Sequence, residues 1–289
     1  MEQAGPASAC PGMTQQNLQW AVPVMRAGYA GRGLIYLVVA VLSLLAIWRG
    51  STPEGTGEAM ASLERAWWGI ALLALIAIGL AAYGIWRLVA AFWDLEAHGS
   101  EAKGIIARIG QVVTGLIHLG LAFTAAAILM PSSSGSNGGS SLDKWTAKIM
   151  QMPFGQWIVG IAGLIGLGAG IYYIWKGVSH KYMENLRAKP MTLKLQPALT
   201  TGLVANGAVI AIVGFLLAYA AWTLNPSEAG GLAEAFDWLR EKPYGTVLVT
   251  ALAVGLLGFS LFCFVNAVYR IVPKLKTDDM ETLARRLAS

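Results

Sequence analysis

The sequence contains little charge: Asp, Glu, Lys and Arg together make up 13% of its 289 residues. A soluble domain carries about 25% charged residues, so this chain has too little polar surface to remain in solution as a globular domain. Cysteine is also scarce. Cys10 lies in a polar N-terminal stretch and Cys263 in an apolar segment, without metal-binding or redox spacing. We therefore expect neither a disulfide nor a cysteine-based metal site.

Acidic residues are absent from the interiors of the long apolar segments. Their absence argues against a carboxylate proton relay and against an intramembrane aspartyl protease. The sequence also lacks a nucleophile elbow, a Walker loop and a zinc-protease motif. We therefore expect no enzymatic activity and no cofactor.

Apolar residues, by contrast, make up 56% of the chain. Six apolar runs are long enough to cross a bilayer core of roughly 30 Å, which takes about 20 helical residues. Helix is the state that satisfies every backbone N–H and C=O in lipid. The predicted spans are Arg26–Trp48, Ala66–Trp86, Ile109–Met130, Trp157–Trp175, Leu199–Leu224 and Thr246–Tyr269.

Most lysines and arginines lie at one set of span ends, and Trp and Tyr rings mark both sets. The positive-inside rule then places both termini in the cytoplasm, and the aromatic rings anchor the spans at the interfaces. We predict a multi-pass protein of the bacterial inner (plasma) membrane. Its partners are the lipid bilayer, and anionic lipid headgroups at the basic cytoplasmic loops, with no nucleic acid.

The chain repeats itself three times, each unit being two spans. Odd spans align on glycines five residues apart, and even spans on a third glycine and on matching Tyr-rich ends. The glycines favour close helix contacts. The triplets are Gly28, Gly110 and Gly202; Gly33, Gly115 and Gly207; and Gly79, Gly168 and Gly258.

Each two-span unit returns the chain to the same side, so the repeats are parallel. We predict an all-α membrane protein whose six helices form a pseudo-threefold bundle. A short amphipathic stretch precedes each even span, namely Met60–Trp67, Leu142–Met152 and Leu232–Lys242, and Ser132–Ser141 is a predicted linker. The chain is predicted to begin with a flexible tail without signal-peptide character, residues 1–19. The three repeats follow at residues 20–100, 101–190 and 191–272, and residues 273–289 form a cytoplasmic tail.

Two motifs indicate a family. The stretch from Arg26 to Tyr36 reads Arg-x-Gly-Tyr-x-x-Arg-Gly-x-x-Tyr, and Pro-Phe-Gly and Pro-Tyr-Gly open the fourth and sixth spans. Together with the threefold repeat, these motifs resemble the bacterial domain-of-unknown-function 1206 family over roughly residues 24 to 270. The resemblance implies the fold and membrane residence only, since the family has no established activity. The first unit departs from it by lacking the proline opening.

The repeat alignment places Arg32, Thr114 and Asn206 at one depth inside apolar surroundings. Tyr36 and His118 follow four residues later, and Gln111 shares a helix face with Thr114 and His118. An arginine in the membrane costs about 2.5–3.5 kcal/mol at a helix centre. We therefore expect this polar set to face the bundle interior, with Arg32, Thr114 and Asn206 around the pseudo-threefold axis.

A structural role is the alternative for the same residues. Arg32 is near its helix start and can reach the headgroups, while Thr114 and Asn206 can hydrogen-bond between helices. His118 is the only histidine in a span, so haem or metal ligation by histidines has no second intramembrane ligand.

Three functional hypotheses follow. The first is a non-enzymatic scaffold or accessory protein with an unidentified membrane-protein partner. The second is a small channel or carrier with an anionic-solute site near Arg32. The third is an enzyme acting on a lipid or quinone, which no motif supports. A polar central path would favour the second hypothesis over the first.

Overall fold

The structure, a computed structural model, describes residues 18–53, 55–64, 67–130, 141–275 and 282–283. Nearly all of the predicted N-terminal tail, with Cys10, lies outside these residues. So do nearly the whole predicted linker and most of the predicted C-terminal tail.

Six long apolar helices dominate the described chain, each with the length and hydropathy needed to cross a membrane. The prediction of six membrane helices is confirmed. Several helices extend beyond the apolar runs, α4 by seven residues at its start. The helices are α1 (Ala21–Trp48), α3 (Gly69–Phe92), α4 (Ala102–Ile128), α6 (Gly155–Val178), α8 (Gln196–Thr223) and α10 (Gly245–Tyr269).

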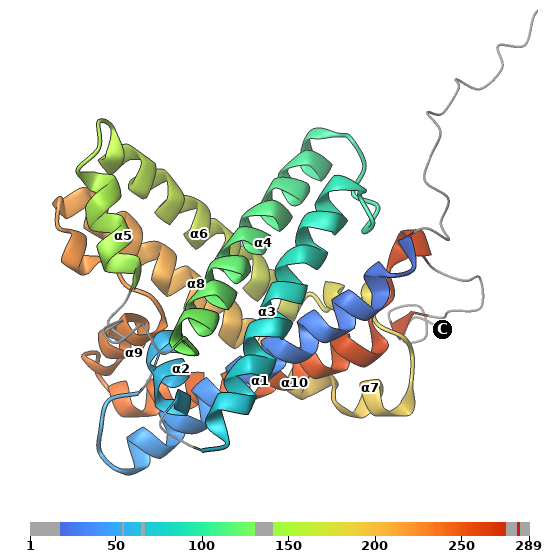
Figure 1. The fold of residues 1–289 in the computed structure, drawn as a ribbon, viewed down its shortest axis with the longest axis horizontal. Helices are drawn as coiled ribbons and strands as arrows, with labels where there is room; N and C mark the ends of the chain where they lie inside the picture. The colour runs from blue at the N-terminus through green and yellow to red at the C-terminus, as the bar shows by residue number, and fades with distance from the viewer. Residues whose placement is uncertain (1–17, 54, 65–66, 131–140, 276–281, 284–289) are drawn as a thin grey trace, which may run out of the picture.

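Three short helices precede the second, fourth and sixth long helices, which are α3, α6 and α10. They overlap the predicted amphipathic stretches. They are α2 (Thr56–Glu64), α5 (Ser141–Met150) and α9 (Leu232–Arg240). All three lie at one end of the bundle, whereas α1 begins and α10 ends at the other (Figure 1). We call the first the short-helix end and the second the basic end. The short α7 (Pro190–Lys194) and a 3-10 turn, Lys181–Asn185, join α6 to α8 at the basic end.

The long helices pack as a ring that is open at one place. Contacts between repeats are α3 with α4, α6 with α8, and α10 with α1; contacts within repeats are α1 with α3 and α8 with α10. A closed threefold ring requires one more neighbouring pair, α4 with α6. Within the described residues these two helices do not pack along one another. The second repeat is therefore split between the two ends of a row running α4, α3, α1, α10, α8, α6.

Glycines make the close contacts within the first and third repeats. A Cβ on Gly31 would overlap the backbone of Gly79, and one on Gly202 would overlap that of Gly258. Gly28 lies against the backbone of Tyr83, at 2.5 Å from a built Cβ to the Cα. A side chain at these positions would force the helices apart. The repeat glycines thus lie where α1 meets α3 and where α8 meets α10.

Three other repeat glycines lie where helices of different repeats meet, and two more face open space. Gly33 faces α10, Gly115 faces α3 and Gly207 faces α6. Among the described residues, no atom lies within 4 Å of a Cβ added at Gly110 or Gly168, so the expected helix contact is not made at these two glycines. The physical reason is the open place in the ring, since these glycines are the counterparts of the pairs that join α1 to α3 and α8 to α10.

The Pro-Phe-Gly and Pro-Tyr-Gly openings work differently from the predicted proline start. The helices begin at Gly155 and Gly245, after the aromatic residue rather than at the proline. Phe154 and Tyr244 take left-handed backbone angles, with φ of 63° and 61°. Such angles are costly for a bulky residue. The motif therefore makes a sharp corner between each short helix and the span that follows it.

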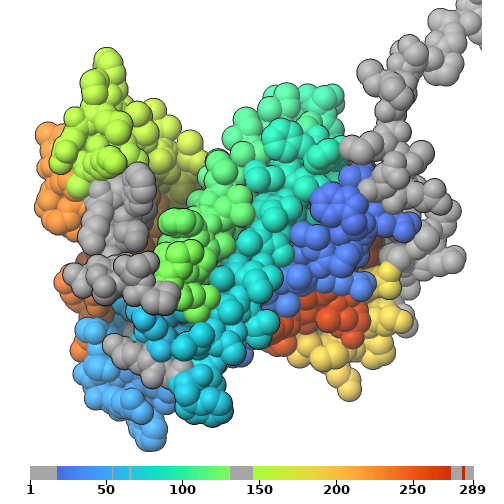
Figure 2. All heavy atoms as spheres, in the orientation of Figure 1, coloured from blue at the N-terminus to red at the C-terminus, as the bar shows by residue number. Residues whose placement is uncertain are grey.

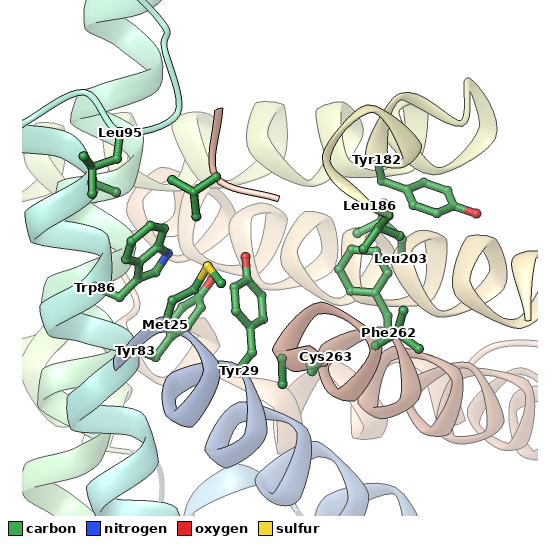
Figure 3. Packing of buried hydrophobic residues seen from close by; sticks show 14 of the residues in the cluster. Met25, Tyr29, Tyr83, Trp86, Leu95, Tyr182, Leu186, Leu203, Phe262 and Cys263 are labelled. Atoms are coloured by element: carbon green, nitrogen blue, oxygen red, sulfur yellow. The ribbon is translucent and has the colours of Figure 1, made fainter. Parts of the chain in front are cut away.

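The core at the basic end is rich in aromatic side chains. Met25 and Tyr29 of α1 project toward Tyr83 and Trp86 of α3, and Cys263 of α10 lies beside them (Figure 3). Cys263 is a buried free thiol. This core surrounds the polar cluster described next.

Candidate functional site

Arg32 is a buried charge enclosed by aromatic rings. It lies in the fourth turn of α1 and is 6% exposed. Its guanidinium carbon is 5.7 Å from the Tyr36 ring centroid, 5.0 Å from that of Tyr83 and 4.9 Å from that of Phe259. Ring faces attract cations, more strongly when both partners are desolvated. The Nε group of Arg32 is buried and has no hydrogen-bond partner among the residues that the structure describes.

Tyr83 joins Arg32 to a second arginine. The Tyr83 hydroxyl oxygen accepts a hydrogen bond from Arg32 Nη1 at 2.9 Å and another from Arg87 Nε at 2.9 Å. Arg87 lies one turn after Tyr83 on α3, so both groups face the same side of the helix. A neutral hydroxyl thus stands between two positive charges.

Glu96, in the connection after α3, forms ion pairs with the other arginines of the site. Its Oε1 accepts from Arg270 Nη2 at 2.5 Å and lies 3.6 Å from Arg87 Nη1. Its Oε2 accepts from Gln111 Nε2 at 2.9 Å and lies 3.4 Å from His98 Nε2. Burial by itself raises the pKa of Glu96. The charge of Arg270, the hydrogen bond with His98 and the charge of Arg87 outweigh it and hold that pKa well below the ordinary value.

Arg270 completes the cluster from the end of α10. Its Nη1 donates to Asn266 Oδ1 at 3.0 Å, and Asn266 Nδ2 donates to the Phe262 carbonyl at 2.8 Å. The Nε group of Arg270 is buried without a partner. We name Arg32, Tyr83, Arg87, Glu96 and Arg270 the arginine cluster. Within the described residues it sets three guanidinium charges against one carboxylate, an excess of two positive charges.

The predicted polar residues take different places around this cluster. Arg32 and Tyr36 are part of it or touch it. Gln111 reaches Glu96, and the His118 ring centroid is 4.6 Å from that of Tyr83. His118 Nδ1 lies 2.8 Å from the Thr114 carbonyl oxygen of its own helix. Gln111 and His118 are each 6% exposed, so α4 presents these two side chains to the bundle interior.

Thr114 and Asn206 form no hydrogen bond with Arg32 in the part of the chain that the structure describes. The Thr114 hydroxyl donates to the Gly110 carbonyl at 2.7 Å, within α4. Asn206 is 1% exposed, and its Nδ2 has no partner. Because α1 packs between α3 and α10, the aromatic residues of those helices enclose Arg32 instead. The arrangement of Arg32, Thr114 and Asn206 around one axis stays a prediction.

Sequence reasoning missed Tyr83, Arg87, Glu96, Asn266 and Arg270. A signal existed for part of the set, because the repeat alignment places Arg87, Lys176 and Asn266 eight residues after Gly79, Gly168 and Gly258. This second polar layer lies on the even helices. Glu96 stands in the connection after α3, outside the matching helices, and only the fold brings it to Arg270.

A bundle of this kind, with six apolar helices in three repeats and a buried cluster of arginines, defines a multi-pass helical membrane protein. The family described as Domain of Unknown Function (DUF1206) matches residues 27–94, 109–180 and 201–270. The chain belongs to this family, and the three matched segments are the three repeats. The resemblance found in the sequence is confirmed.

A relative from Bacillus subtilis (strain 168), described as uncharacterized protein YxxB, is 26% identical over 260 residues. The match covers 89% of this chain and 94% of that protein. No solved structure matches the chain. These relationships support the fold and leave the activity to be argued from the arginine cluster.

Proposed function

We propose that this membrane protein is a small carrier or channel that binds an anion at the arginine cluster, with Arg32 as its main contact. The observation that carries the proposal is the buried excess of positive charge. Guanidinium groups bind phosphate and carboxylate oxygens more strongly than neutral donors do. A bound anion would neutralise part of an excess that burial makes costly.

Arg32 is the better candidate contact, because Glu96 already serves the other two arginines. Arg270 and Arg87 both lie within salt-bridge distance of that carboxylate. Arg32 meets a tyrosine hydroxyl and three rings, and it keeps an unpaired Nε. An oxyanion beside Arg32 would supply the missing acceptor. In this proposal the Glu96 contacts hold α3, α4 and α10 together, and Arg32 is the group left for a ligand.

Binding without chemical conversion agrees with the state of the neighbouring groups. Glu96 has a depressed pKa and several hydrogen-bond donors around it, which makes it a weak base. His118 uses Nδ1 on a main-chain carbonyl. We therefore propose a non-enzymatic role. A scaffold that works through an unidentified membrane-protein partner is the function that remains if no anion binds.

The proposal includes an orientation. The basic end would face the cytoplasm of a bacterial inner membrane, with both termini inside, as the distribution of Lys and Arg favours. Basic loops there would contact anionic headgroups. The arginine cluster would then lie in the cytoplasmic half of the bilayer.

The test is thermal unfolding of the purified chain in neutral detergent, with phosphate, sulfate, carboxylates and acidic lipids as ligands. A ligand at 100 times its Kd stabilises by about 2.7 kcal/mol, which corresponds to a rise in Tm of about 5–10 °C. We expect Arg32→Gln to abolish the rise and Arg32→Lys to retain part of it. Arg49→Gln is the control, because Arg49 is exposed and directly follows the last residue of the same helix.

Flux across proteoliposomes then tests transport. An anion flux that is lost in Arg32→Gln and kept in Arg49→Gln supports a carrier or channel. Stabilisation of the wild type and of Arg32→Gln by the same amount would place the binding elsewhere and refute the assigned site.

A further inference from the structure

The open place in the ring, between α4 and α6, borders the arginine cluster. From one side, α4 presents Gln111 and His118 to Glu96 and Tyr83. From the other side, Tyr173 of α6 packs against the buried core that contains Tyr83. Both helices thus reach the surroundings of the cluster, and within the described residues they do not pack along one another as the corresponding helices of the other repeats do.

Repeat-equivalent positions show that the two facing surfaces are uncovered. Ile117 of α4 is 57% exposed, whereas its counterparts Ile35 and Val209 are 3% and 8% exposed. Tyr172 of α6 is 52% exposed, whereas Tyr83 and Phe262 are buried. Side chains at equivalent repeat positions are therefore buried in the first and third repeats and exposed in the second.

The glycine pattern supports the same conclusion. Gly202 and Gly258 bring α8 onto α10, and their counterparts Gly110 and Gly168 touch nothing within 4 Å. In Figure 2 the outline of the molecule is indented between α4 and the helices α5 and α6. We name the space between Gly110 and Ile117 on one side, and Ile165, Gly168 and Tyr172 on the other, the lateral opening.

Resting on the proposed function, we infer that the anion is the phosphate headgroup of an acidic lipid, which enters through the lateral opening. Ile117 and Ile165, at 57% and 66% exposed, make the two walls apolar. Apolar walls suit acyl chains, because hydrocarbon needs no polar partner there. The arginine cluster behind them suits a phosphate. An acidic phospholipid has both parts in one molecule, and a free inorganic anion has only one.

The test compares three ligands on the full chain in neutral detergent: phosphatidylglycerol, phosphatidylcholine and water-soluble glycerol 3-phosphate. Thermal shift gives the apparent affinity, and native mass spectrometry counts retained lipid. We expect phosphatidylglycerol to stabilise the wild type at concentrations at least tenfold below those needed for phosphatidylcholine. Arg32→Gln should remove this preference.

Two tryptophan substitutions block the lateral opening, one on each wall. Ile165→Trp and Ile117→Trp should each weaken phosphatidylglycerol binding at least tenfold and leave glycerol 3-phosphate binding within twofold. Leu164→Trp and Leu116→Trp are the controls, because both residues are exposed, at 63% and 58%, and each precedes its wall residue by one position, which turns its side chain by about 100° around the helix. The two controls should bind lipid like the wild type.

The outcomes separate the two proposals. Arg32-dependent binding of glycerol 3-phosphate without preference for phosphatidylglycerol would refute the lipid and keep the anion site. Lipid binding that both blocking variants retain would refute entry through the lateral opening. Absence of Arg32-dependent binding for every ligand would refute the proposed function itself.

Discussion

Replacing Glu96 by Gln tests whether the arginine cluster depends on its one carboxylate. Glu96 is 12% exposed at its side chain and lies within 3.6 Å of Arg270 and Arg87. Removing one partner of a buried ion pair costs about 3–5 kcal/mol, since it leaves an uncompensated charge. Gln keeps one acceptor oxygen for Arg270, so we expect a cost near the lower limit, about 3 kcal/mol.

The measurement is Tm in neutral detergent at pH 7. A loss of about 3 kcal/mol corresponds to a decrease of about 6–12 °C for a chain of this size. Glu101→Gln is the matched control, because it removes the same charge from a residue that is exposed and lies five positions later. An exposed glutamate gains only about 0.2–1 kcal/mol even when it forms an ion pair. The control should therefore lower Tm by less than about 4 °C.

The pH dependence adds a second check. The pKa of Glu96 is depressed in the folded protein, and an unfolded glutamate titrates near 4.3. Its contribution is therefore full above about pH 4.3 and is lost as the pH falls through the folded value. The Tm difference between wild type and Glu96→Gln should stay constant from pH 8 to about pH 5 and narrow below about pH 4. Equal Tm values at pH 7, or a difference unchanged by acid, would refute the reasoning.

Three further predictions use the same chain. Gly202→Ala should cost about 1–3 kcal/mol by overpacking against Gly258, while Gly168→Ala, in open space, should be neutral or stabilise by up to about 1 kcal/mol; equal Tm changes would contradict the helix contact. Tyr83→Phe should cost about 1–3 kcal/mol, because the hydroxyl accepts from both Arg32 and Arg87, and a Tm like that of the wild type would contradict this. In a cysteine-free background, an impermeant maleimide applied to intact cells should label Ser51→Cys and spare Glu101→Cys; the reverse pattern would invert the predicted orientation.

Local patterns in the sequence were enough to predict the helices and the repeats. Apolar runs fix where a chain can cross a bilayer, and the glycine triplets mark equivalent positions whatever the packing. Arg32, Gln111 and His118 were found because a polar group in an apolar run is costly wherever its helix lies. These inferences depend on single helices and on comparison between them.

Packing between distant segments was beyond the same reasoning. Glu96 follows α3 in an ordinary connection, and its contact with Arg270 spans 174 residues. The repeat pattern predicts that Gly110 and Gly168 meet as Gly202 and Gly258 do, and the structure separates them. Equivalent sequence positions share a helix face, but the neighbours of each helix decide whether that face is covered.

The enclosure of Arg32 by the last helix has a consequence for how the protein is made. Ser260 of α10 donates to the Gly33 carbonyl of α1 across 227 residues of chain, and Phe259 beside it forms one wall around Arg32. At about 5–20 residues per second of synthesis, α1 is in the membrane for about 10–45 s before that wall exists. Arg32 lies in the fourth turn of α1, and its long side chain lets the guanidinium reach toward the headgroups during this interval. Arg32 is thus first able to interact with lipid headgroups, and it becomes a buried charge when α10 packs against α1.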